Sequence, residues 1–199
     1  SSPFDEQSAD ILEKLGVPAY KIASGDLTHI PLIRHIAKKR KPIFMSTGAG
    51  TIEQIRDAVK TVFTSGNRRL VLLHCISNYP TQPQESHLEM IPFLKKTFHL
   101  PAGFSDHTIG IGVSIGAVAL GANVIEKHFT DTREGGSHDD PNSLEAGEFK
   151  RTVEEIRNTE QAISQSGIKQ PVSYSGHAGD EIHDRWMRRS ICAIEDISA

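Results

Sequence analysis

Two short polar runs could do chemistry together: Ser-Asp-His at positions 105–107 and Glu-Lys-His at positions 126–128. Each run ends an apolar segment of the kind that forms a buried strand. Because side chains alternate along a strand, the first and third residues of each run share a face, and the middle residue points the other way. Neighbouring strands lie about 4.8 Å apart, so adjacent strands would bring the two sets together.

The two histidines, His107 and His128, with Glu126 beside one of them, are typical of a divalent-metal site. Mixed nitrogen and oxygen ligands suit manganese, iron or zinc better than calcium. The alternative is a pair of hydrogen-bonded core histidines, and this stays open at the level of sequence.

A second group combines hydroxyls with a lysine. Ser24, Ser46, Thr47 and Ser105 lie at the ends of predicted strands, and Lys21 shares a strand with Ser24. Hydroxyls, loop N–H groups and one cation suit a phosphate. The alternative is that these residues cap helices, as serine and threonine often do.

The segment Gly135–Pro141 follows the last predicted strand and contains Asp139 and Asp140. It is either an acidic turn without a function or a lid that brings Asp139 over the site.

The elements that must position these residues alternate regularly. The predicted strands are Ala19–Ser24, Pro42–Thr47, Leu70–Ile76, Ala102–His107 and Asn123–Thr130. The predicted helices are Asp5–Leu15, Leu32–Lys39, Thr51–Phe63, His87–Phe98, Gly112–Ala122 and Leu144–Ile163, with a capping box at Thr51 and Gln54. The strands are nearly continuous in apolar residues, which indicates a parallel sheet covered on both faces. Polar residues at the ends of several strands favour a barrel over an open sheet, where ligands gather at one switch point.

The number of units is smaller than a barrel requires. Five strand–helix units are visible where a (β/α)8 TIM barrel has eight, and no strand precedes the helix Asp5–Leu15. We therefore expect an α/β chain that covers about the last five units, with residues 1–180 as a partial barrel domain. Arg188–Ile194 is predicted as a further short strand.

Composition excludes some classes of function. A net charge of −3 and a pI near 6.4 give no basic surface for nucleic acid or an acidic membrane. The apolar stretch Ile109–Ile125 is short for a membrane span and is interrupted by glycines. The two cysteines are far apart, and no basic signal region opens the chain, so we expect a cytoplasmic protein.

Together, several runs resemble the sialic acid synthase family, and the resemblance extends from Ser1 to about Ile197. The runs are Lys21-Ile22-Ala23-Ser24-Gly25-Asp26, Ser46-Thr47-Gly48, Leu73-His74-Cys75-Ile76-Ser77-Asn78-Tyr79-Pro80, Gly103-Phe104-Ser105-Asp106-His107-Thr108 and Ala119 to Thr130. The resemblance implies a barrel followed by a small antifreeze-like domain, with residues 181–199 as a linker towards that absent domain. It also implies a transferase that condenses phosphoenolpyruvate with an N-acetylated amino sugar, such as N-acetylmannosamine, and releases phosphate.

The resemblance also implies roles for individual residues. It makes His107 and His128 ligands of a divalent metal, Mn²⁺ or Mg²⁺, and it makes Glu126 and Asp139 the acidic site residues, with Tyr79 on the sugar side. The implied phosphoenolpyruvate contacts are Ser2, Lys21, Ser24, Ser46, Ser77 and Ser105. The loop after the last strand departs from the family's Gly-Pro-Asp-His form, so Asp140 is an alternative to Asp139.

The partners expected are phosphoenolpyruvate, the amino sugar and a second copy in a homodimer, with no nucleic acid and no membrane. Because barrel strands are missing, we expect the chain to be inactive by itself. Two alternatives remain: another phosphoenolpyruvate-condensing or aldolase-type barrel, and a non-catalytic barrel remnant that serves as a binding module. The second is motivated by the sheet edge that missing strands would leave open.

Overall fold

The computed structural model describes residues 1–164. The predicted strand Arg188–Ile194, the linker 181–199 and the end of the predicted domain 1–180 lie outside the described residues.

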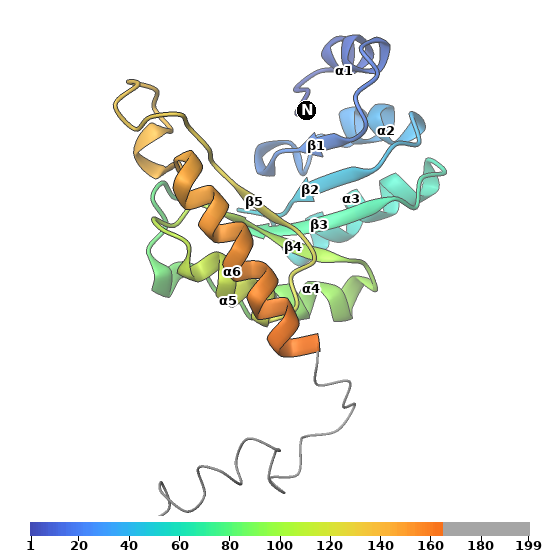
Figure 1. The fold of residues 1–199 in the computed structure, drawn as a ribbon. Coiled ribbons are helices and arrows are strands. Elements are labelled where there is room, and N and C mark those ends of the chain that lie inside the picture. Colours follow the sequence, from blue (N-terminus) through green and yellow to red (C-terminus); the bar gives the residue numbers. More distant parts are fainter. Residues whose placement is uncertain (165–199) are drawn as a thin grey trace, which may run out of the picture. The chain divides into compact units, whose positions relative to one another are not determined.

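A single parallel sheet organises the described chain (Figure 1). Its strands are β1 (Tyr20–Ile22), β2 (Ile43–Ser46), β3 (Leu70–Cys75), β4 (Ala102–Asp106) and β5 (Ile125–Lys127). They lie in the order β1-β2-β3-β4-β5, and every neighbouring pair is parallel. Within residues 1–164, β1 and β5 are the two edges, so the parallel sheet is confirmed but its closure into a barrel is not.

Helices follow the predicted pattern, with somewhat different ends. They are α1 (Glu6–Lys14), α2 (Ile30–Lys38), α3 (Ile52–Thr64), α4 (Met90–Phe98), α5 (Gly112–Ala119) and α6 (Ala146–Ser164), with 3-10 turns η1 (Ser24–Asp26), η2 (Pro83–Glu85) and η3 (Asp140–Asn142). The capping box is confirmed, because Thr51 and Gln54 each bond the other's backbone N–H. No helix among residues 1–164 is long and apolar enough to cross a membrane.

Two helix starts were predicted more than one residue too early. α4 begins at Met90 instead of His87, whose φ of 42° lies in the left-handed region. α6 begins at Ala146 because Leu144 is still extended and forms a bridge with Phe129.

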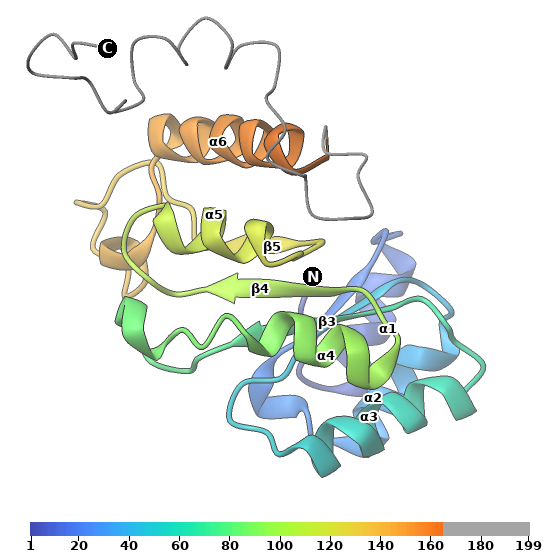
Figure 2. The same cartoon turned by 90° about the horizontal axis from the view of Figure 1, so that it is seen from below.

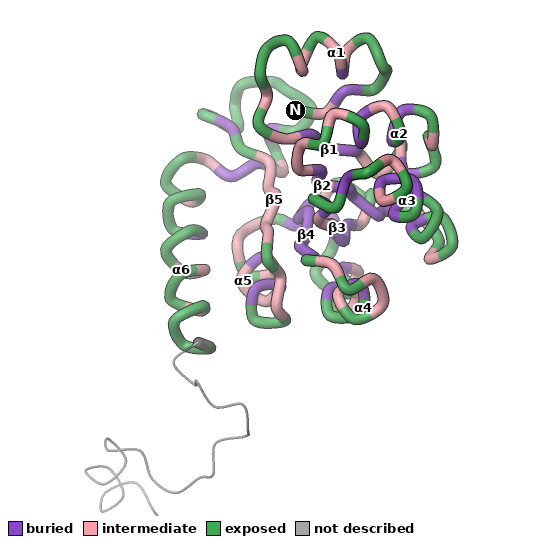
Figure 3. Tube along the Cα trace, turned by 90° about the vertical axis from the view of Figure 1, so that its right-hand side faces the viewer, coloured by how far each residue is buried: buried purple, intermediate pink, exposed green. Residues whose placement is uncertain are grey.

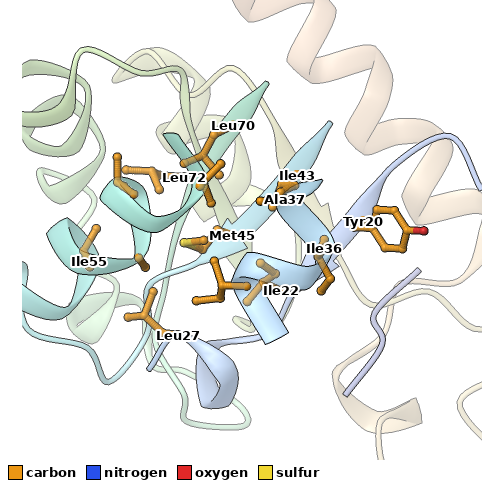
Figure 4. Packing of buried hydrophobic residues seen from close by; sticks show 14 of the residues in the cluster. Tyr20, Ile22, Leu27, Ile36, Ala37, Ile43, Met45, Ile55, Leu70 and Leu72 are labelled. Atoms are coloured by element: carbon orange, nitrogen blue, oxygen red, sulfur yellow. The ribbon is translucent and has the colours of Figure 1, made fainter. Parts of the chain in front are cut away.

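The core lies on the face of the sheet that the helices cover (Figure 2). Figure 4 shows Ile22, Met45 and Leu72 of successive strands packed beside Ile36 of α2 and Ile55 of α3. All five are buried, and each such side chain contributes roughly 1.5–3 kcal/mol to folding. Burial colouring shows the buried residues concentrated at the strands and at the inward sides of the helices (Figure 3).

The chain before α1 runs beside the edge strand β1. The Lys21 N–H donates to the Ser1 carbonyl at 2.8 Å, and the Ser1 amino group lies 3.4 Å from the Ala19 carbonyl oxygen. Among the described residues no strand precedes α1, as predicted, although these contacts place Ser1 beside β1.

The sheet is strongly curved. Four strand spacings separate β1 from β5, which is roughly 19 Å in a flat sheet. Lys21 of β1 nevertheless donates to Glu126 of β5 at 2.8 Å. A lysine and a glutamate side chain together span less than that flat distance, so the sheet must bend as it does in a barrel.

Candidate active site

A pocket of about 280 Å³ opens at the carboxyl ends of the strands, and all five strands contribute to it. It is lined by Lys21, Ala23, Ser24, Gly25, Ser46, Cys75, Ser77, Tyr79, Ser105, His107, Glu126 and His128. The strand ends therefore meet at one site, as the barrel interpretation expects.

One hydrogen-bonded group joins three strands across the pocket. A single oxygen of Glu126 accepts from Lys21 at 2.8 Å and from Ser105 at 2.6 Å. Burial raises the pKa of Glu126, but the hydrogen bonds from Lys21 and Ser105 outweigh it, and the net pKa lies below its ordinary value. Glu126 is therefore ionised at neutral pH, and its second oxygen remains available as an acceptor.

Small polar groups converge around Gly48. A Cβ at this position would lie 2.6 Å from the Cys75 Sγ and 2.9 Å from the hydroxyl oxygens of both Ser24 and Ser77. Ser24 and Cys75 also contact each other, with 3.0 Å between Oγ and Sγ. The missing side chain of Gly48 is thus what allows two hydroxyls and a thiol to approach the same place.

Ser46 lies in the same pocket and is only 2% exposed. Its hydroxyl is buried and has no hydrogen-bond partner within the described residues. Leaving such a group unpaired costs roughly 1–3 kcal/mol, so a ligand or a water is expected to complete it. The hydroxyls and Lys21 together form a set of donors suited to an anion.

The two histidines face each other with ring centroids 5.4 Å apart and planes at 83°. The Nδ1 of His107 lies 2.8 Å from the Ile76 carbonyl, which can only accept, so Nδ1 carries the proton and Nε2 keeps its lone pair. Burial lowers the pKa of His107, although the Ile76 carbonyl opposes this effect, and the ring is neutral at neutral pH.

These two rings fit a divalent ion. A carbonyl bonded to one imidazole nitrogen is the usual support for a histidine that ligates metal through the other. On the other ring, the Nδ1 of His128 lies 3.6 Å from a carboxylate oxygen of Asp139. Within residues 1–164 no three histidine, cysteine or acidic side chains group as metal ligands, so solvent or substrate oxygens would complete the coordination.

Tyr79 covers the histidines. Its ring centroid lies 4.1 Å from that of His107 and 5.8 Å from that of His128. Burial, followed by the nearby Cys75, Asp139 and Glu126, raises the pKa of the phenol, so Tyr79 stays protonated at neutral pH.

The alternation expected from the sequence is found. Ser105 pairs in register with Glu126, and both line the pocket. Asp106 pairs with Lys127 in the next position, and these two form an ion pair of 3.1 Å away from the pocket lining.

Three predicted residues do not line the pocket. The hydroxyl of Thr47 donates to the Leu73 carbonyl at 3.2 Å instead. Ser2 lies beside β1, with its hydroxyl 3.4 Å from the Lys21 carbonyl. Asp139 lies at the rim, next to His128. The alternative carboxylate, Asp140, is buried and accepts from the Ser137 N–H at 2.7 Å, so it serves the loop itself.

Sequence reasoning missed Cys75 and Gly48 as parts of the site. The signal for Cys75 was its place two residues before Ser77, because that spacing puts both side chains on one face of an extended segment. No comparable spacing points to Gly48, since its role depends on the three side chains that surround it in the folded protein.

The curved parallel sheet, with charged and polar groups at the carboxyl ends of its strands, is an α/β half-barrel similar to that of TIM-barrel-like synthases. Comparison of sequences then makes the assignment specific, because the NeuB family profile matches residues 1–168. The chain belongs to the NeuB family, which confirms the resemblance seen in its motifs.

Named relatives agree with this membership. The chain is 39% identical over 199 residues to the N,N'-diacetyllegionaminic acid synthase of Campylobacter jejuni, covering 99% of the chain and 58% of that protein. It is 37% identical over 159 residues to the N-acetylneuraminate-9-phosphate synthase of Drosophila melanogaster, covering 79% of the chain and 43% of that protein. The chain thus spans about half the length of these relatives.

A solved structure supports the fold. The N-acetylneuraminic acid synthetase of Leptospira borgpetersenii, in complex with citrate, superposes with a TM-score of 0.82 at 32% identity. The match covers 94% of this chain and 65% of the other.

Proposed function

We propose that the protein carrying this chain condenses phosphoenolpyruvate with an N-acetylated amino sugar to a sialic-acid-type nonulosonic acid, releasing phosphate. The observation that carries the proposal is the single pocket that combines an anion-binding group of donors with two metal-competent imidazoles. The names of the relatives, an N,N'-diacetyllegionaminic acid synthase and an N-acetylneuraminate-9-phosphate synthase, support the choice of product class.

The donors around Gly48 and Ser46 would hold the phosphate. Ser24, Ser46 and Ser77 offer hydroxyls, and Lys21 offers a cation on the same side of the sheet. Donors that are fixed before the substrate arrives stabilise developing charge without reorganising. Ser105 adds a further hydroxyl, while Ser2 acts, in this proposal, on the same substrate from the edge beside β1.

His107 and His128 would hold Mn²⁺ or Mg²⁺. When bound, the ion supplies a Lewis acid that polarises the aldehyde of the open-chain sugar. The histidines would fix its place. Tyr79, whose ring is tilted against His107 and edge-on to His128, would limit the access of water and present its phenol to the sugar.

Two carboxylates are available to move protons. Glu126 is ionised and held by Lys21 and Ser105. It can therefore accept a proton from the water that adds to the phosphate-bearing carbon of phosphoenolpyruvate during the reaction. Asp139, at the rim beside His128, is the alternative proton acceptor. Lower turnover in Glu126→Gln than in Asp139→Asn would assign the base to Glu126.

The proposal includes a cytoplasmic enzyme, in keeping with the free thiol of Cys75. A homodimer stays a prediction, as does the amino sugar itself.

The test is phosphate release by the whole protein that carries this chain, with phosphoenolpyruvate, Mn²⁺ and a panel of N-acetylated amino sugars, phosphorylated and not. Sugar-dependent phosphate release and a nonulosonic acid in the mass spectrum are expected. Lys21→Met should abolish the activity. Lys95→Met should retain it, because within the described part of the chain this lysine bonds the Gly121 carbonyl, outside the pocket. The absence of phosphate release with every sugar would refute the proposal.

A further inference from the structure

The β4–β5 ladder ends at the pair Asp106 and Lys127. His107 and His128 each lie one residue beyond this last rung. The separation of the two imidazoles therefore depends on what holds the strand ends together at the rung and just after it.

Lys127 links the two strand ends through its side chain. Its ammonium lies 3.1 Å from an Asp106 carboxylate oxygen and also donates to the Thr108 carbonyl. From the residue before His128, it thus bonds both neighbours of His107.

The ion pair between Asp106 and Lys127 is buried, and the Asp106 carboxylate also accepts hydrogen bonds from its surroundings. The side chain of Asp106 is 0% exposed and that of Lys127 is 2% exposed. Asp106 accepts from the Thr108 N–H at 2.8 Å, from the Thr108 hydroxyl at 2.7 Å and from the Ser114 hydroxyl at 2.5 Å. Since Ser114 belongs to α5, the same carboxylate fixes the helix that connects the two strands.

Stability alone does not account for this pair. Removing two charges from water costs so much that well-packed neutral residues often stabilise a fold equally well. What a buried and fully bonded pair does provide is one defined geometry. The separate anchors of the histidines, Ile76 for His107 and Asp139 for His128, orient each ring but do not join the two.

We propose that Asp106 and Lys127 are a positioning pair that fixes the two imidazoles relative to each other and thereby sets the affinity of the site for a divalent ion. The metal part of this inference rests on the proposed function. The geometric part does not, because it concerns the chain's own strand ends.

The first test is the double variant Asp106→Asn/Lys127→Met in the whole protein. Asparagine can still bond Thr108 and Ser114, and no charge is left buried without a partner. We expect a melting temperature close to that of the wild type but a Mn²⁺ affinity, measured by titration without substrate, about 10- to 100-fold weaker. The control is Val62→Ala, a core truncation in α3 that lowers the melting temperature and should leave Mn²⁺ affinity unchanged.

The second test does not involve metal. Diethyl pyrocarbonate acylates accessible imidazoles, and peptide mass spectrometry gives the rate at each histidine of the metal-free protein. His107 is 7% exposed, so it should react slowly in the wild type and in Val62→Ala, and several-fold faster in the double variant. If the wild type binds no Mn²⁺, the metal part of the proposed function fails, and the acylation rates alone decide whether the pair positions the rings.

Unchanged Mn²⁺ affinity together with unchanged acylation in the double variant would overturn the inference, as would equal effects in Val62→Ala. If the double variant does not fold, Ser114→Ala takes its place, because it removes one donor to Asp106 and leaves no charge unpaired. Ser114→Ala should weaken Mn²⁺ affinity and speed the acylation of His107, each by a smaller factor than the double variant. If neither changes, the positioning role of the pair is refuted.

Discussion

Replacing Gly48 by alanine tests the anion-binding group directly. The added Cβ would lie 2.6 Å from the Cys75 Sγ and 2.9 Å from two serine hydroxyl oxygens, whereas ordinary contacts begin near 3.4 Å. Because Gly48 does not have a positive φ, the backbone accepts alanine, and the cost is one of overpacking, about 1–3 kcal/mol. Restricting the unfolded chain offsets roughly 0.4–1 kcal/mol of this, so the loss of stability should be modest.

The larger effect of Gly48→Ala should be on the KM for phosphoenolpyruvate. If the clash moves the Ser24 or Ser77 hydroxyl away, one hydrogen bond to a charged phosphate is lost, which is about 1.5–3 kcal/mol. That predicts a KM for phosphoenolpyruvate raised by roughly 10- to 150-fold, since 1.4 kcal/mol corresponds to a factor of ten.

The assay is initial phosphate release as a function of phosphoenolpyruvate concentration, with melting temperatures measured with and without inorganic phosphate. Gly112→Ala is the matched control, because no atom of the described residues lies within 4 Å of its added Cβ and its φ is not positive. A KM within twofold of wild type in Gly48→Ala, with unchanged stabilisation by phosphate, would show that these hydroxyls do not contact the substrate.

Three further predictions concern single residues. Ser46→Ala removes a buried hydroxyl that has no hydrogen-bond partner among residues 1–164, so the melting temperature should stay level or rise while the KM for phosphoenolpyruvate rises about tenfold; a lower melting temperature with unchanged KM would contradict this. Burial lowers the pKa of His74 against the opposing effect of the Ser86 carbonyl, so below about pH 6.5 the unfolded chain binds a proton that the folded chain resists, and stability falls as the pH falls. Between pH 7.5 and 5.5 the melting temperature of His74→Gln should therefore fall less than that of the wild type. Equal falls would show that His74 does not contribute to the pH dependence. Thr51→Ala removes a helix cap at a cost of about 1 kcal/mol without changing any KM, as denaturant unfolding and kinetics together would show.

The sequence predicted the sheet and much of the pocket for a clear physical reason. Strand runs such as Leu70–Cys75 are apolar on both faces, so periodicity alone indicates a covered parallel sheet. Alternation then sorts Ser105 from Asp106 without any knowledge of the fold.

Other features could not be predicted, because they depend on distances across the sheet. Curvature decides whether Lys21 reaches Glu126, and no local pattern encodes it. The same holds for the contact of the Tyr79 ring with His107, and for Asp139 instead of Asp140 at the rim, since loop geometry selects between adjacent carboxylates.

The bond between Lys21 and Glu126 joins residues 105 positions apart in the sequence. Closing so long a stretch of chain costs conformational entropy that is recovered only when the intervening strands have paired. The pocket should therefore assemble among the last events of folding, after β1 to β5 have formed their ladders. In a partly folded chain the hydroxyls and the lysine proposed to bind phosphate would lie apart from the histidines. Substrate binding should therefore report on completed folding rather than on the presence of the individual strands.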